Sequence, residues 1–177
     1  MGITFWFNSW YTTGMSIEES LLRGGVWYNI WDDSTGTNKS SSLSFINSFF
    51  TALRNHNIDY NPQLPEAILA REKRQSTNLG NGIAIPHPDF DGLNEPAESP
   101  ITRDTIYLAY PRFSLLWDDG TSVFAVFFIC MTSKEKHLAA LSDLAKGLSK
   151  PGVMDLLKAR EPLEPLLTVF RAKKSND

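Results

Sequence analysis

Cysteine is almost absent from this sequence, since Cys130 is the only one among 177 residues. A single cysteine forms no intramolecular disulfide, which fits a reducing compartment such as the cytoplasm. Cys130 lies in the apolar run 123–131, and burial in such a run raises the pKa of a thiol and keeps it inert. We therefore expect a cytoplasmic protein in which Cys130 is a buried strand residue.

Long hydrophobic runs and a large excess of one charge are also missing. No run reaches the roughly 18 apolar residues that cross a bilayer, so membrane insertion is not expected. The net charge is -3 and 21% of the residues are charged, which indicates neither disorder nor a basic face for nucleic acid. Any partner must therefore be recognised by a local patch.

The chain contains enough apolar residues, 42% of the total, to build one substantial core, and its length is typical of a single domain. The first fourteen residues, MGITFWFNSWYTTG, are rich in aromatic side chains but lack the basic start and aliphatic centre of a signal peptide. We interpret residues 1–14 as a leader and expect the domain over 15–177, beginning at Met15.

Helix signals occur near both ends of the chain. Ser16 and Ser133 are good N-caps, and apolar residues recur at helical spacing over 41–56. After Ser133, one stripe is expected to face the core: Leu138, Leu141, Leu144, Ala145 and Leu148. Helices are predicted from Ser16 to Gly24, over 41–56, over 65–75, over 133–150, from Pro151, and over 162–170.

Strand signals lie in the first two-thirds of the chain. Strands are predicted over 26–31, 83–85, 105–110 and 123–131, with a turn at 118–120 and loops at 32–40 and 89–103. Strands in this region, with helices at both ends, predict an α/β fold. We expect a three-layer α/β/α sandwich with a mixed central sheet.

One histidine, His87, stands between Pro86 and Pro88 directly after a short predicted strand. Proline fixes its own φ and restricts the residue before it, so this imidazole is held on a stiff strand end. A neutral imidazole is a nucleophile near pH 7 when a hydrogen bond to one nitrogen leaves the lone pair on the other. His56, in Asn-His-Asn at a helix end, is expected on the surface instead.

Two other kinds of site are weakly supported. Gly80 and Gly82 form a Gly-x-Gly pattern, but they precede a strand, and position 85 is isoleucine where a dinucleotide-binding motif has its third glycine. The three histidines show no short ligand spacing and no clustered acidic partners, which disfavours a metal site. No cofactor and no metal are expected.

The segment LAREKRQSTNLGNGIAIPHP, residues 69–88, resembles the signature of the type 2 IIA domain (EIIA) of the bacterial phosphotransferase system, which includes fructose, mannitol and nitrogen-regulatory members. The resemblance extends over 15–170 and is carried by these residues: Arg71-Glu72, Ser76-Thr77, Gly80-Asn81-Gly82, Ile83-Ala84-Ile85-Pro86-His87, the strand 123–129, and His137-Leu138. The text SIEESLLRGGVWYNI, residues 16–30, resembles a subgroup in which the domain follows an excisionase-type DNA-binding head.

The resemblance implies roles for individual residues. His87 would be phosphorylated, His137 would lie beside it and contact the phosphoryl group, and the Arg71 guanidinium would fork onto phosphate oxygens. Weaker candidates for phosphate binding are Thr77, Asn81 and the backbone amide of Gly82. The alternative for Arg71 and Glu72 is an exposed ion pair at a helix end.

The implied function is that of a phosphocarrier, which accepts phosphate from a phosphohistidine carrier of the HPr type and passes it to a cysteine of a IIB-type partner. Pro88 and the acidic loop at 89–98 depart from transport-type members and favour a regulatory subgroup, in which phosphate would switch binding to a target protein. Two rivals stay open: a non-catalytic binding module with the same fold, and a regulatory domain that binds a small molecule.

Overall fold

The computed structural model describes residues 16–30, 41–90 and 101–171. The predicted leader, the domain start at Met15, the loop at 32–40 and most of the acidic loop lie outside the described residues. The last residue of the predicted strand 26–31 also lies outside them.

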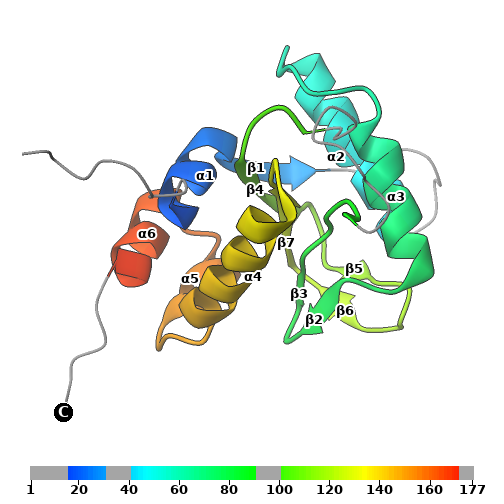
Figure 1. The fold of residues 1–177 in the computed structure, drawn as a ribbon. Coiled ribbons are helices and arrows are strands. Elements are labelled where there is room, and N and C mark those ends of the chain that lie inside the picture. The colour runs from blue at the N-terminus through cyan, green and yellow to red at the C-terminus, as the bar shows by residue number, and fades with distance from the viewer. Residues whose placement is uncertain (1–15, 31–40, 91–100, 172–177) are drawn as a thin grey trace, which may run out of the picture.

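A mixed sheet of five strands forms the middle layer, with the order β1-β4-β7-β3-β2 (Figure 1). Its strands are β1 (Val26–Ile30), β2 (Asn78–Gly80), β3 (Ile83–Ala84), β4 (Thr105–Pro111) and β7 (Ala125–Cys130). The β1–β4 and β3–β7 pairs are parallel, whereas β4–β7 and β2–β3 are antiparallel. A separate hairpin is formed by β5 (Leu115–Leu116) and β6 (Ser122–Val123).

Helices cover both faces of the sheet (Figure 1). On one side lie α2 (Ser42–Asn55) and α3 (Leu64–Arg74), and on the other lie α1 (Ile17–Gly24), α4 (Lys134–Leu148), α5 (Val153–Ala159) and α6 (Leu163–Arg171). The predicted three-layer α/β fold with a mixed sheet is therefore confirmed. Among the described helices, none is long and apolar enough to span a membrane.

The side chains of strand β7 alternate between two core clusters, one on each side of the sheet. Val126 and Phe128 join the cluster beneath α2 and α3, and Phe127 and Ile129 join the cluster beneath the other four helices. A strand buried on both faces has no polar side to alternate with, which explains its continuous apolar sequence. Cys130 is also buried here, and burial raises its thiol pKa to about 12, as expected for an inert cysteine.

The helix caps follow the sequence signals. Ser16 and Glu19 form a reciprocal capping box, and the Ser133 side chain accepts a hydrogen bond from the Lys136 amide. Two strand details differ from the predictions. The run 123–131 divides into β6 and β7, because the Gly82 carbonyl accepts hydrogen bonds from the amides of both Phe124 and Ala125. The short polar strand β2 carries too weak a pattern to be recognised.

The predicted core stripe of α4 is confirmed at three of its five positions and wrong at two. Leu144 is buried and Leu141 and Leu148 are partly buried against the same core cluster, whereas Leu138 and Ala145 are exposed. Leu138 is 56% exposed, and the buried residues of the helix are His137, Ala140, Leu144 and Gly147. These residues also recur at helical spacing. Two of them, Ala140 and Gly147, are small and allow close packing, since a Cβ added at Gly147 would meet the ring of Phe170. The buried face of the helix therefore includes His137, with Leu141 and Leu148 at its margin.

Replacing Phe128 by alanine tests the centre of the core. Phe128 is fully buried and stacks on Phe49 with ring centroids 4.1 Å apart. We expect Phe128→Ala to lower the free energy of unfolding by about 3–5 kcal/mol, because it leaves a cavity that the surroundings fill only partly. Urea unfolding measures the change. The control Leu22→Ala, at a side chain 56% exposed, should stay within about 0.5 kcal/mol, and equal losses would contradict the assignment.

Candidate functional site

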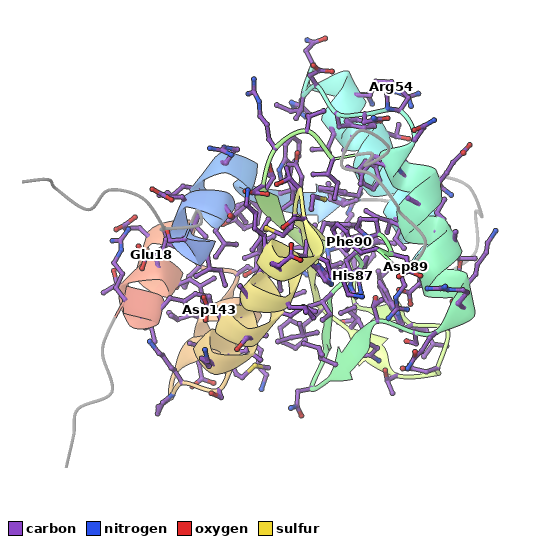
Figure 2. All side chains as sticks on the ribbon, in the orientation of Figure 1. Glu18, Arg54, His87, Asp89, Phe90 and Asp143 are labelled. Atoms are coloured by element: carbon purple, nitrogen blue, oxygen red, sulfur yellow. The ribbon has the colours of Figure 1, made fainter. Side chains whose placement is uncertain are left out.

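The sheet places His87 just beyond the carboxyl end of β3. β3 runs parallel to β7, and the pairing continues past β3 because the Ile129 amide donates to the Pro86 carbonyl at 3.0 Å. His87 therefore lies where the carboxyl ends of two neighbouring parallel strands meet, an edge at which open α/β sheets commonly bind ligands. In Figure 2, His87 and Phe90 lie between α4 and α3.

A hydrogen bond to the backbone orients the His87 ring. Its Nδ1 lies 2.7 Å from the carbonyl oxygen of Ile85. Because a carbonyl only accepts hydrogen bonds, Nδ1 carries the hydrogen and Nε2 carries the lone pair. The side chain is largely buried, yet Nε2 forms no hydrogen bond within the described part of the chain. The nucleophilic nitrogen is thus left free.

His137 lies at the same edge of the sheet and comes from helix α4, which follows β7 in the sequence. α4 begins four residues after β7 ends, and His137 lies in its first turn. The ring centroids of His87 and His137 are 4.6 Å apart with an interplanar angle of 44°, and the ring centroids of Phe90 and His137 are 5.2 Å apart. The structure therefore brings the two predicted histidines together.

Burial lowers the pKa of both imidazoles. For His87, the loss of hydration is the largest cause; the Ile85 carbonyl opposes it and the charge of Arg71 adds to it. For His137, burial, then the charges of His87 and Arg71, lower the pKa to about 4. Both rings are therefore neutral near pH 7, and the buried Nδ1 of His137 has no hydrogen-bond partner among the described residues.

Arg71 lies on α3, within electrostatic reach of both rings, since its positive charge lowers the pKa of each. Its guanidinium donates a hydrogen bond to the Gln75 carbonyl at 2.7 Å. The alternative of an exposed Arg71–Glu72 pair is wrong, because Glu72 is 4% exposed and bonds to Thr77 and Trp117 instead. Only the fold brings Trp117 to Glu72, so no local sequence signal could reveal this contact.

The weaker phosphate-binding candidates lie elsewhere. The Thr77 hydroxyl donates to the Glu72 carboxylate. Asn81 and Gly82 form the turn before β3, at the end of that strand opposite His87. Five residues of extended chain correspond to about 16 Å, so the structure does not bring this turn to the imidazole.

Two predictions remain, one on the position of His56 and one on a metal site. His56 is exposed and packs edge-on against Trp27, in agreement with its predicted surface position. Among the described residues, no three His, Cys, Asp or Glu side chains cluster in a way that could hold a metal ion.

Comparison with solved structures shows which known fold the chain adopts. Enzyme IIA-Mtl of Escherichia coli, in its complex with phosphorylated enzyme IIB-Mtl, matches with a TM-score of 0.61 at 16% identity, over 85% of this chain and 96% of that one. The nitrogen regulatory protein IIA-Ntr of Neisseria meningitidis matches with a TM-score of 0.58 at 22% identity, over 84% and 94%. The fold is that of phosphotransferase-system IIA domains.

The sequence comparisons narrow this class to one family. The family "Phosphoenolpyruvate-dependent sugar phosphotransferase system, EIIA 2" matches residues 29–172. The chain belongs to this family and is therefore a IIA-type phosphotransferase component, as predicted.

The curated relatives include multiphosphoryl transfer proteins and nitrogen regulatory proteins. A multiphosphoryl transfer protein of Vibrio cholerae is 32% identical over 61% of this chain and 26% of its own length. A nitrogen regulatory protein of Pseudomonas aeruginosa is 34% identical over 59% of this chain and 65% of its own length. The chain thus spans about a quarter of the multiphosphoryl transfer proteins that it matches.

The depressed pKa of His137 makes stability depend on pH. Between 6.5 and about 4, the unfolded imidazole binds a proton that the folded one does not, so the free energy of unfolding decreases as the pH falls through this window. We expect a loss of up to about 3 kcal/mol from this group. Urea unfolding across the window should show a shallower loss in His137→Gln than in the wild type, whereas His56→Gln should keep the wild-type slope. Identical slopes in all three would refute the assignment.

Proposed function

We propose that this protein is a phosphocarrier in which Nε2 of His87 takes up a phosphoryl group and hands it to a partner protein. The observation that carries the proposal is the hydrogen bond from Nδ1 to the Ile85 carbonyl, which leaves the lone pair on Nε2. The depressed pKa of His87 supports the same role, because a neutral ring is the nucleophilic form.

The chemistry of the step follows from this tautomer. The Nε2 lone pair attacks the phosphorus of a phosphohistidine donor, an N–P bond forms at His87, and the N–P bond of the donor breaks with its electron pair returning to the donor nitrogen. The His87 ring keeps its hydrogen on Nδ1 and acquires positive charge. The Ile85 carbonyl stabilises that charge and adds to the driving force for the step.

His137 and Arg71 are suited to hold the phosphoryl oxygens. A neutral His137 ring with its hydrogen on Nε2 would donate to a phosphoryl oxygen, and its buried Nδ1, which has no partner among the described residues, would then be the nitrogen without a hydrogen. The Arg71 guanidinium supplies positive charge from the opposite helix. Phosphoryl transfer depends mainly on positioning and on such stabilisation of charge.

The proposed partners are a phosphohistidine carrier of the HPr type as donor and a cysteine of a IIB-type domain as acceptor. The complex of a related IIA enzyme with phosphorylated IIB supports the second. We also propose that the transfer takes place in the cytoplasm, where a single buried thiol such as Cys130 stays reduced. No nucleic acid is proposed as a partner of this domain.

A regulatory use of the same phosphate is the second candidate, favoured by the similarity to nitrogen regulatory proteins. Phosphate on His87 would add up to two negative charges to the face that a target protein meets. The rival from another class is a binding module with the IIA fold that takes no phosphate, and the presence of both imidazoles in contact argues against it.

Labelling with phosphate tests the proposal directly. Incubation with phosphoenolpyruvate carrying labelled phosphate and the general phosphotransferase enzymes should give an acid-labile label on the wild type and none on His87→Ala. The control His56→Ala should be labelled like the wild type. An unlabelled wild type would favour the binding module over the phosphocarrier.

The two supporting side chains are tested by the rate of labelling. His137→Leu and Arg71→Gln should each slow phosphorylation of His87 by about 10–100-fold, because each removes a donor that faces the transferring group. Lys73→Gln makes the same change of charge at an exposed position two residues further along α3 and should leave the rate within about twofold of the wild type. A rate loss in Lys73→Gln that matches the loss in Arg71→Gln would assign the effect to overall charge.

A further inference from the structure

One buried carboxyl group close to the site has no part in the chemistry above. Glu72 is 4% exposed and accepts hydrogen bonds from the Thr77 amide at 3.1 Å, from the Thr77 hydroxyl, and from the Trp117 indole at 2.8 Å. The last turn of α3, the residue before β2 and the β5–β6 connection therefore meet on a single side chain.

Burial of Glu72 is not explained by a paired charge. In the described part of the chain it forms no ion pair. Acidic side chains are rarely buried without such a pair, because removing them from water costs free energy. An apolar side chain of similar volume would fill the same space without that cost. The carboxylate at position 72 therefore contributes the hydrogen bonds that it accepts from Thr77 and Trp117, which an apolar side chain could not form.

Those bonds lead to His87 through one short backbone path. The Thr77 carbonyl accepts a hydrogen bond from the Ile85 amide at 3.0 Å, and the Ile85 carbonyl accepts the hydrogen of His87 Nδ1. The peptide unit that holds the Ile85 carbonyl ends in the nitrogen of Pro86, which has no hydrogen to donate. The orientation of this peptide unit therefore depends on the hydrogen bonds on either side of it. The Ile85 amide donates to the Thr77 carbonyl, and the Pro86 carbonyl accepts from the Ile129 amide.

We propose that Glu72 is a positioning residue for phosphoryl transfer: by fixing Thr77, it fixes the Ile85 carbonyl and so selects the Nδ1–H tautomer of His87. The mechanistic part of this inference rests on the proposed phosphocarrier function, but the effect on the tautomer does not. Glu72 also anchors the turn of α3 that carries Arg71, so the same contact sets the position of the guanidinium.

The Glu72→Gln variant tests the inference, because it keeps the shape of the side chain while replacing one acceptor oxygen with a donor. The measurement is the set of two-bond proton–nitrogen correlations of the imidazoles in the unphosphorylated, nitrogen-15-labelled full chain. The wild type should show His87 as the Nδ1–H tautomer, and Glu72→Gln should show a mixture of both tautomers. Phosphorylation of His87 should slow by about tenfold in the variant.

A second variant and a control separate positioning from loss of stability. Thr77→Val replaces the hydroxyl with a methyl group, which removes the hydroxyl's hydrogen bond to Glu72 and keeps the shape of the side chain. It should shift the His87 tautomer in the same direction, which decides the question even if Glu72→Gln does not fold. Leu167→Ala empties a fully buried position on α6, in the cluster on the opposite face of the sheet from α3, and should lower stability without changing the tautomer.

The outcomes distinguish this inference from the proposed function. Folded Glu72→Gln or Thr77→Val with His87 still held as the Nδ1–H tautomer would overturn the positioning role, as would a tautomer shift of equal size in Leu167→Ala. A wild type that takes no phosphate, alongside a shifted tautomer in Glu72→Gln, would sink the phosphocarrier function and leave the positioning role in place.

Discussion

The site depends on one hydrogen bond, from Nδ1 of His87 to the carbonyl of Ile85, two residues earlier in the chain. This bond decides which nitrogen holds the lone pair and where it points. It forms where Pro86 continues the extended backbone beside β7 and the Ile85 amide is held by the Thr77 carbonyl. The reactivity of the imidazole is therefore set by backbone geometry, and the other groups at the site act on a ring that is already oriented.

The sheet explains why the site lies where it does. Both faces of β4 and β7 are filled by apolar side chains, so only the strand ends are left for polar chemistry. At the edge beyond β3 and β7, the chain delivers His87 directly, and α4 starts there and delivers His137. Arg71 comes from α3 in the opposite layer. Groups from both helical layers thus converge on one strand end, where burial, with a smaller contribution from the charge of Arg71, lowers the pKa of two neighbouring imidazoles.

The sequence predicts those parts of the fold that are governed by local chemistry. Caps at Ser16 and Ser133, the helical spacing over 41–56 and the proline-flanked His87 each indicate the structure that is found. Contacts that depend on packing are less accessible. The exposure of Leu138 and Ala145 on α4 was missed, because helical spacing does not show where the margin of the buried face lies. The burial of Glu72 was missed because its partner Trp117 lies 45 residues away. Asn81 and His87 belong to the same short motif, but the extended segment that includes β3 holds the turn at Asn81 away from the imidazole.

The orientation of the His87 ring also restricts the product that the site can form. A phosphoryl group can join an imidazole at either nitrogen, giving two isomers that differ in direction and in resistance to hydrolysis. In the proposed transfer, the phosphorus can attach only at Nε2, because Nδ1 donates its hydrogen bond to the Ile85 carbonyl. Each partner would therefore have to approach Nε2 from outside the end of the sheet. A donor or acceptor whose reactive group cannot reach Nε2 from that direction would be excluded, even where no other contact disfavours it.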